Sequence, residues 1–301
     1  FQMLKGEFDS IGSVVKNYHN FFVHGEYRNK TRNKKWDVEA FGNFYVNGLN
    51  AGDYDAHVSL KRLISQQVGS LQVGFSNVNR TPSFVFDTLS SFYFGTPRNF
   101  NKENYTELFG AFDVPRLKLN LHGRYLLISN YTYFSDYKEA QQYGTLFNML
   151  QVTAEKTFRL GRKWNWRTWV VLQKLTGDPP VNLPLLLTRN MIGYDGNLGF
   201  KNLYTNFGLE IRYYTSYKGD AYSPVIGQFF NQNTQTIKMQ LPDIAAYMHF
   251  RIKSFSAYIR VENLNAYDFS TNKFTRNNVV SPNYPYPGMF MRFGVYWTFV
   301  N

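Results

Sequence analysis

The sequence predicts an all-β fold, a transmembrane antiparallel up-and-down β-barrel of about 14 strands (12–16) that forms a single domain over residues 1–301. Three observations predict it. Aromatic residues make up 19% of the chain, yet the mean hydropathy is −0.40, so apolar and polar residues are finely mixed. No stretch reaches the ~18–20 consecutive apolar residues of a transmembrane helix. Many segments alternate, which places one row of side chains in lipid and the other inside a barrel.

The alternation is clearest where Leu117, Leu119 and Leu121 interleave with charged and amide side chains. Most alternating runs reach the ~9–11 residues that a tilted strand needs to cross a bilayer. An even number of strands lets the first pair with the last and closes the sheet. Seven clear runs cover residues 36–47, 54–61, 116–127, 163–173, 203–212, 244–253 and 255–262, a C-terminal run covers 289–299, and weaker candidates lie at about 15–29, 67–79, 104–113, 142–158, 185–195 and 225–236.

The connections between these runs differ in length. The short ones, Asn50–Gly52 and Lys253–Ser254, are typical of periplasmic hairpin turns. The long Pro- and Asn-rich ones, residues 80–104, 177–184 and 265–288, suit loops on the other side or loops folded into the lumen. The chain begins at Phe1 without a signal peptide, so we expect a mature or truncated chain, such as the C-terminal part of a longer barrel.

The C-terminal strand carries an apolar row that looks like the assembly signal of bacterial outer-membrane barrels. We therefore expect the outer-membrane assembly machinery to bind the chain through this strand. The residues of the row are Phe293, Val295, Trp297 and Phe299.

The opposite row of the alternation is expected to line the lumen, and it is rich in basic residues. Such a surplus would favour anions in a water-filled pore. Alternatively, the charges pair and fill a narrow barrel, and the large rings on this row, such as Trp169 and Tyr247, favour a constricted interior. The expected lumen-lining basic residues are Lys61, Arg116, Lys118, Arg124, Lys163, Arg167, Arg212, Arg251, Lys253, Arg260 and Arg292, and the acidic ones are Asp37, Glu39, Asp55, Glu155, Glu210 and Glu262.

Residues for chemistry are sparse. The chain has no cysteine, and its histidines lack a metal-ligand spacing, so we expect no metal, no cofactor, no catalytic residue and no enzymatic activity. His57, His122 and His249 are interpreted as hydrogen-bonded lumen side chains rather than parts of a hydrolase site. The clustered Gly193, Gly196 and Gly199 are expected to relieve crowding or mark bulges.

Residues 222–230, 260–265 and 291–299, and more weakly 81–87, resemble the putative porin family of outer-membrane β-barrel proteins from Bacteroidota. The resemblance implies an integral, multi-pass barrel in a bacterial outer membrane. Family members look longer than this chain, with additional barrel sequence before the equivalent of Phe1.

We expect a porin-like passive diffusion channel for small polar or anionic solutes. The alternative is a non-conducting barrel subunit of a larger outer-membrane complex for protein secretion or assembly. The net charge of +12 suggests anionic partners. The expected partners are outer-membrane lipid and lipopolysaccharide, the assembly machinery and possible partner subunits, but no nucleic acid.

Overall fold

The computed structural model describes residues 2–8, 14–32, 35–87, 99–268, 270–274 and 278–299, with side chains from residue 18 onward. Fourteen strands form one antiparallel sheet in which nearly every strand pairs with the next along the chain. No helix in these residues has the length and apolar content of a membrane span. The strands of the sheet are, in order, β1 (Gln2–Phe8), β2 (Val14–Lys30), β3 (Trp36–Gly48), β4 (Tyr54–Ser65), β5 (Gly69–Arg80), β6 (Glu103–Val114), β7 (Leu119–Ser129), β10 (Phe147–Arg159), β11 (Trp164–Thr176), β12 (Leu186–Asn197), β13 (Leu203–Tyr214), β18 (Asp243–Ile252), β19 (Phe255–Glu262) and β24 (Phe290–Trp297).

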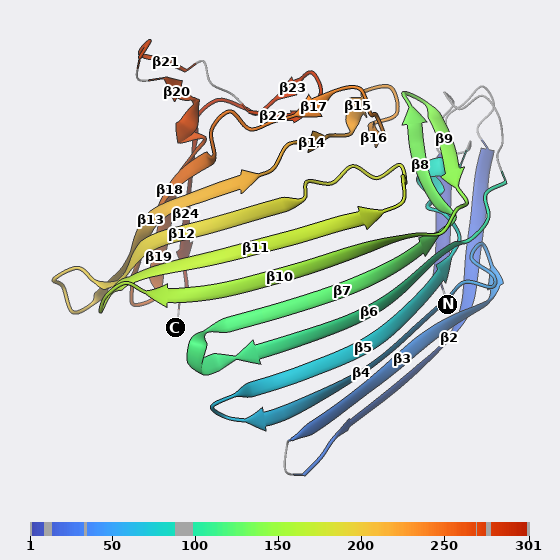
Figure 1. Ribbon diagram of the computed structural model, residues 1–301, viewed down its shortest axis with the longest axis horizontal. Coiled ribbons are helices and arrows are strands. Elements are labelled where there is room, and N and C mark those ends of the chain that lie inside the picture. Colours follow the sequence, from blue (N-terminus) through green and yellow to red (C-terminus); the bar gives the residue numbers. More distant parts are fainter. Residues whose placement is uncertain are drawn as a thin grey trace.

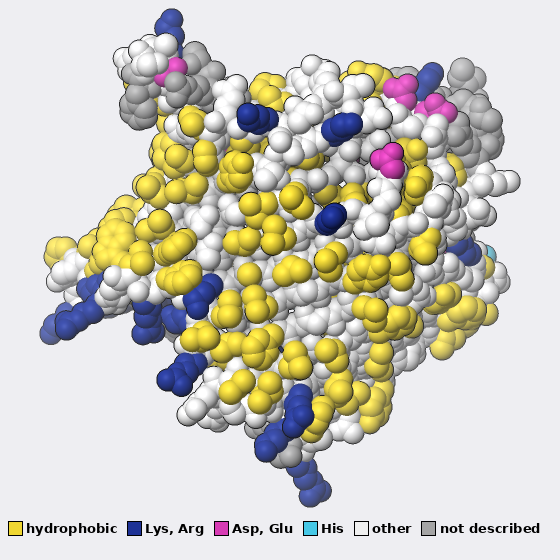
Figure 2. All heavy atoms as spheres, in the orientation of Figure 1, with side chains coloured by type: hydrophobic (Ala, Val, Ile, Leu, Met, Phe, Trp, Pro, Cys, Tyr) yellow, Lys and Arg dark blue, Asp and Glu magenta, His cyan; other side chains and the backbone are white. Residues whose placement is uncertain are grey.

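The sheet is curved (Figure 1). Its two faces differ in side-chain character as the alternation predicts. Side chains of the outer row are apolar and exposed; among them, Val58, Phe75, Leu108 and Tyr125 lie in line across four neighbouring strands. Figure 2 shows apolar side chains over much of the viewed face. The inner row, on the opposite face, carries the charged and amide side chains. Exposed apolar side chains on every second position are what a lipid-facing wall requires.

The connections between strands differ in length at the two ends of the sheet. At one end, which we call the turn edge, each of β2–β3, β4–β5, β6–β7, β10–β11, β12–β13 and β18–β19 is joined by a short turn. At the other end, the loop edge, the connections are long. Among the connections whose residues are described, the exception is Asn50–Gly52, which joins β3 to β4 at the loop edge. Its assignment to the same side as Lys253–Ser254 is therefore wrong, because consecutive strands of a meander turn at alternate ends.

Two expected strand positions are corrected, and one strand is added. The segment 225–236 does not cross the sheet; it contains only the short β16 (Gln228–Phe230), which pairs with β15 (Ala221–Ser223). The run from 116 begins as a strand only at Leu119, because Pro115 opens a short 3₁₀ turn, η3 (Pro115–Leu117), and cannot donate to the ladder. The strand β1 was not expected.

The expected pairing of the first and last strands does not occur among the described residues. β1 pairs with Val14–Asn20 of β2, and the pairing of β2 with β3 starts only at Asn20, which lies opposite Gly48. The β1–β2 hairpin therefore extends past the end of β3. β1 and β24 form the two edges of the sheet.

The long connections pack on one another at the loop edge, and we call their described residues within 81–102, 130–146, 177–185, 215–242 and 263–289 the loop layer. Phe134, Ala140 and Phe230 form a buried apolar cluster in it. The Ser223 hydroxyl donates to the Tyr137 carbonyl at 2.5 Å, which joins two of these connections. Its short elements are η1 (Phe84–Phe86), β8 (Tyr131–Asp136), β9 (Glu139–Tyr143), β14 (Tyr217–Lys218), β15, β16, β17 (Thr236–Ile237), η4 (Leu264–Ala266), β20 (Tyr267–Asp268), β21 (Lys273–Phe274), β22 (Val279–Ser281) and β23 (Tyr284–Pro285).

Candidate functional site on the inner face

A fully buried carboxylate, that of Glu210 on β13, binds three arginines on the inner face. Arg189 on β12 donates from Nε and Nη2 to the two carboxylate oxygens at 2.9 and 3.0 Å. Arg212 donates from Nε at 2.5 Å, and Arg260 on β19 from Nη1 at 3.1 Å. The bidentate contact is the strong geometry for an arginine–carboxylate pair. One negative charge thus holds three positive ones.

The cluster continues to the edge strand β24. Arg260 also donates from Nε to Glu262 at 3.1 Å, and the Arg292 Nε lies 3.5 Å from the same carboxylate oxygen. The Arg260 Nη2 atom is enclosed and has no hydrogen-bond partner among the described residues. Four arginines therefore share two glutamates, and this part of the inner face keeps a surplus of positive charge.

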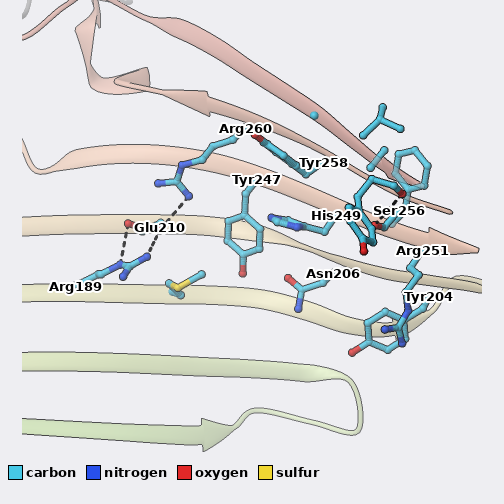
Figure 3. Close-up of a pocket in the computed structure, with 16 residues that line it drawn as sticks. Arg189, Tyr204, Asn206, Glu210, Tyr247, His249, Arg251, Ser256, Tyr258 and Arg260 are labelled. Carbon is cyan, nitrogen blue, oxygen red and sulfur yellow. Dashed lines mark hydrogen bonds and ion pairs between the residues drawn. The ribbon is translucent and has the colours of Figure 1, made fainter. Parts of the chain in front are cut away.

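A groove of about 790 Å³ runs beside this arginine cluster (Figure 3). Arg260 and Glu210 lie toward one end of the groove, and Arg251 lies toward the other beside Tyr204. Its wall is made of polar rings: His249 stacks on Tyr258 with 5.6 Å between ring centroids and meets Tyr247 edge to face at 6.0 Å. The groove offers hydroxyl, imidazole and guanidinium groups along an aromatic floor, a lining that suits polar and anionic solutes.

Glycines make room for these rings. A Cβ at Gly294 would lie 2.3 Å from the Tyr258 ring, and one at Gly193 would lie 2.5 Å from the Tyr247 hydroxyl. Tyr258 and Tyr247 can therefore lie against the backbone of the neighbouring strands. This agrees with the expectation that Gly193 relieves crowding; Gly196 and Gly199 instead have positive φ angles near the β12–β13 turn.

The structure places most of the expected lumen residues on the inner row but does not gather all of them. Arg124 lies 3.6 Å from Glu107, and Arg28 lies 3.5 Å from Asp37, both far along the sheet from Glu210. Asp55 accepts hydrogen bonds from Asn43 at 2.6 Å. The expected residues on the inner row of strands are Asp37, Glu39, Asp55, Lys61, Arg124, Glu155, Arg167, Glu210, Arg212, Arg251, Arg260, Glu262 and Arg292.

Four expected lumen residues lie in turns at the turn edge instead, because the strands end before them: Arg116, Lys118, Lys163 and Lys253. Lys118 still borders a small groove on the inner face together with Arg167 and Asp195. Lys163 turns the other way, since its Nζ donates to the hydroxyl of Tyr194, an outer-row residue, at 3.0 Å. Its assignment to the lumen is wrong, although it does lie at the rim.

Sequence reasoning missed Arg189, a central member of the cluster. The alternating positions Arg189, Met191, Gly193 and Asp195 could have indicated an inner row, but the outer row of β12 mixes Asn190 with Ile192 and weakened the signal.

Two pairs at the loop edge were also missed. Arg80 donates to the buried Glu103 at 2.9 Å, and Lys102 binds Asp53. Burial raises the pKa of Asp53, but hydrogen bonds from Lys102, Thr81 and Asn50 outweigh it, so the pKa lies below its ordinary value.

The expected lumen histidines lie against aromatic rings: His57 and His249 are stacked, and His122 is tilted. His57 lies between Phe41 and Phe109, with ring centroids 4.7 and 5.6 Å away. His122 is 6.2 Å from Phe109. Within the described ranges, no group of three or more histidine, aspartate or glutamate side chains is placed to hold a metal ion.

A family model described as "Putative porin" matches residues 5–301. No curated protein matches the chain.

Solved structures share the fold at low sequence identity. The chain is similar to the copper transporter OprC, with a TM-score of 0.65 and 12% identity over 94% of this chain and 50% of that one. It is also similar to a mutant of the ferric enterobactin receptor PfeA from Pseudomonas aeruginosa (TM-score 0.61, 12% identity, 96% and 46% covered). A third is the siderophore receptor PirA from Acinetobacter baumannii (0.60, 12%, 95% and 46%). The chain spans about half the length of these proteins.

Proposed function

Since the chain belongs to the putative porin family and is an integral outer-membrane β-barrel, we propose that it is a passive diffusion channel for small polar or anionic solutes. The observation that carries this proposal is the arginine cluster of the inner face, in which four arginines share Glu210 and Glu262 beside a polar groove. Arginines lining an aqueous path lower the barrier for anions and raise it for cations.

Some of these arginines stabilise the sheet through ion pairs, whereas others are free to interact with solutes in the groove. Arg189 and Arg212 are committed to the buried Glu210. Arg292 is the more exposed partner of Glu262, with 58% of its side chain accessible, and Arg251 packs over the Tyr204 ring at 5.5 Å. The charges of Arg292 and Arg251 can therefore be removed without breaking a contact to Glu210.

The test is conductance of the purified, folded protein in planar bilayers under a salt gradient. We expect open-channel currents with a reversal potential on the anion side, and a shift toward cations in the double variant Arg251→Gln, Arg292→Gln. The double variant Lys156→Gln, Lys174→Gln is the matched control, because these lysines lie on the outer row opposite Leu119 and Leu150 and do not face the groove. Conduction with no anion preference, or an equal shift in the control, would contradict the anionic selectivity.

A second candidate is a non-conducting subunit of a larger outer-membrane complex, and the packing of the loop layer favours it. Phe134, Ala140 and Phe230 are buried there, and Ser281 donates to the Asp220 carbonyl at 2.7 Å across two connections. Interlocked loops of this kind leave less room for solutes at the loop edge. No open-channel current, together with proteins that co-purify stoichiometrically from the native membrane, would decide for this candidate.

A further inference from the structure

The outer row ends at the turn edge in a belt of aromatic rings. Phe158 stacks on Trp166 with 4.8 Å between centroids, and Trp164 meets Tyr194 edge to face at 6.0 Å. Farther along the belt, Phe255 meets Trp297 at 5.9 Å. Aromatic rings mark the boundary between hydrocarbon and head groups on outer-membrane barrels. We therefore place the lipid head groups of one leaflet beside this belt, at the turn edge.

Three cations lie over rings of this belt, on the lipid-facing side. The Arg62 guanidinium lies 4.8 Å from the Trp36 ring, the Lys156 Nζ lies 5.2 Å from the Phe158 ring, and the Lys163 Nζ lies 5.5 Å from the Tyr194 ring.

The strand register confirms that this is the outer side. Arg62 is opposite Trp36 and Leu71, and Lys156 is opposite Leu119 and Thr168. Each cation therefore stands at the edge of an apolar wall.

These cations have no acidic neighbour on their own face. Among residues whose side chains are described, the outer row of the sheet contains no Asp or Glu, and the acids nearest the turn edge, such as Asp37 and Asp113, belong to the inner row. Lys163 uses two of its ammonium protons on the Tyr194 hydroxyl and the Asn197 carbonyl at 3.0 and 2.7 Å, which leaves one for another acceptor. The described turn residues add Arg32, Lys35, Arg116, Lys118, Arg162, Lys201 and Lys253 without any acid.

The distribution of charge between the two ends points the same way. Figure 2 shows Lys and Arg side chains without Asp or Glu along the lower margin of the viewed face, whereas charges of both signs occur among the loops above. The loop edge carries acids in its connections, such as Asp136, Glu139 and Asp178. The positive charge at the turn edge is therefore not balanced by acids on the outer row or in the described turns.

We propose that Arg62, Lys156 and Lys163, which we call the rim cations, bind the phosphate groups of anionic glycerophospholipids in the leaflet at the turn edge. The acyl chains of a phospholipid can pack on the apolar outer row. Its phosphodiester group can bind the cations that lie over the rings at the end of that row. Short turns of outer-membrane barrels face the periplasm, so this leaflet is the phospholipid leaflet. Basic residues near an anionic membrane surface each add to lipid binding.

Native mass spectrometry of the full chain, released from micelles with phosphatidylglycerol or phosphatidylcholine, tests the proposal. We expect retained phosphatidylglycerol on the wild type and a loss of at least about tenfold in its affinity in the triple variant Arg62→Gln, Lys156→Gln, Lys163→Gln. The matched control is Lys174→Gln, Lys218→Gln, Lys238→Gln, which removes the same charge at the loop edge and should leave binding unchanged.

Several outcomes would overturn it. One is equal binding of phosphatidylcholine, which would assign lipid contact to the aromatic belt alone. Another is an equal loss in the loop-edge control, and a third is displacement of the lipid by inorganic phosphate at the same concentration. Preferential retention of lipopolysaccharide at the rim cations would place them in the opposite leaflet and would also count against it. Heat modifiability on gels verifies that each variant is folded, and none of these readouts depends on conductance.

Discussion

Arg189 and Arg212 lie directly opposite each other on β12 and β13, and both donate hydrogen bonds to the carboxylate of Glu210. Like charges in directly opposed positions destabilise a pair of strands. The Glu210 carboxylate binds both arginines and so offsets their repulsion. Arg260 on β19 donates to the same carboxylate and links a third strand to it. The close approach of these three arginines on the inner face thus depends on one carboxylate.

Glu210→Gln should therefore destabilise the sheet. The amide keeps one acceptor oxygen but directs an NH₂ group at an arginine, and lost hydrogen bonds to a charged group cost about 1.5–3 kcal/mol. The measurement is urea unfolding of the protein in lipid vesicles. Glu155→Gln is the control, since Glu155 is an inner-row glutamate opposite Asn120 and Trp169. A similar loss in both variants would show that Glu210 has no special role.

Gly294→Ala should destabilise the pairing of β19 and β24 by about 1–3 kcal/mol, because the added methyl group would overlap the Tyr258 ring. The effect should largely vanish in a Tyr258→Ala background, as a double-mutant cycle on unfolding free energies would reveal. Gly123→Ala serves as control, since a Cβ there meets nothing within 4 Å. Additive effects of the two changes would contradict the close contact.

Protonation of Asp220 should stabilise the loop layer as the pH falls into the mildly acidic range. Burial raises the pKa of this carboxyl, although Asn182 donates to it at 2.8 Å and lowers the pKa in part. The folded state thus binds a proton at a pH where the unfolded state, with a pKa of 3.8, does not. Stability rises as the pH falls through the folded pKa toward 3.8, whereas the contribution of Asp53 is lost only below 3.8.

Proteolysis of the loops over a series of pH values from 7.5 down to 4 measures this effect. The wild type should be cleaved more slowly as the pH falls once protease activity is normalised, and Asp220→Asn should remove the difference. Asp136→Asn, at the exposed end of β8, should not. A wild-type cleavage rate that is constant over the whole series would refute the expectation.

The C-terminal row provides a test of assembly. Phe293, Val295, Trp297 and Phe299 are between 57% and 79% exposed on the outer face, so a partner can reach them. We predict that Trp297→Ala with Phe299→Ala lowers the amount of folded protein in the outer membrane of cells several-fold while refolding in detergent is retained. Tyr296→Ala, on the inner row, should assemble normally, and an equal deficit there would argue against recognition of the outer row.

The sequence predicts the face of the sheet on which a residue lies better than it predicts where a strand ends. The side on which a residue lies follows from its parity along a strand, so the outer positions of Val58 and Leu121 and the inner position of Glu210 were predictable. Where a strand ends was less so. The expected strand at 116 fails at Pro115, which has no N–H for the ladder.

Contacts between strands were beyond sequence reasoning, because they depend on register. Parity places Arg189, Glu210 and Arg260 on one face, but only the observed pairing shows that they meet. The predicted side of the Asn50–Gly52 turn was wrong for a related reason. Its short length suggested the turn edge, but the number of strands that precede it determines at which end of the sheet it lies. The segment 225–236 was mistaken for a spanning strand because a short hairpin of the loop layer alternates in the same way.

The up-and-down order has a consequence for how the molecule acquires its shape. Most wall contacts join neighbours in sequence, so the strands can be added one hairpin at a time with little loop-closure entropy. The loop layer is different: Ser223 reaches Tyr137 across 86 positions, and the Tyr214 hydroxyl donates to Val279 across 65. Such contacts can form only after the intervening strands are in register. Each contact of the loop layer is thus made after the strands between its partners, β10 to β13 for Ser223 and Tyr137, and a stalled intermediate would hold paired strands whose loops are not yet joined.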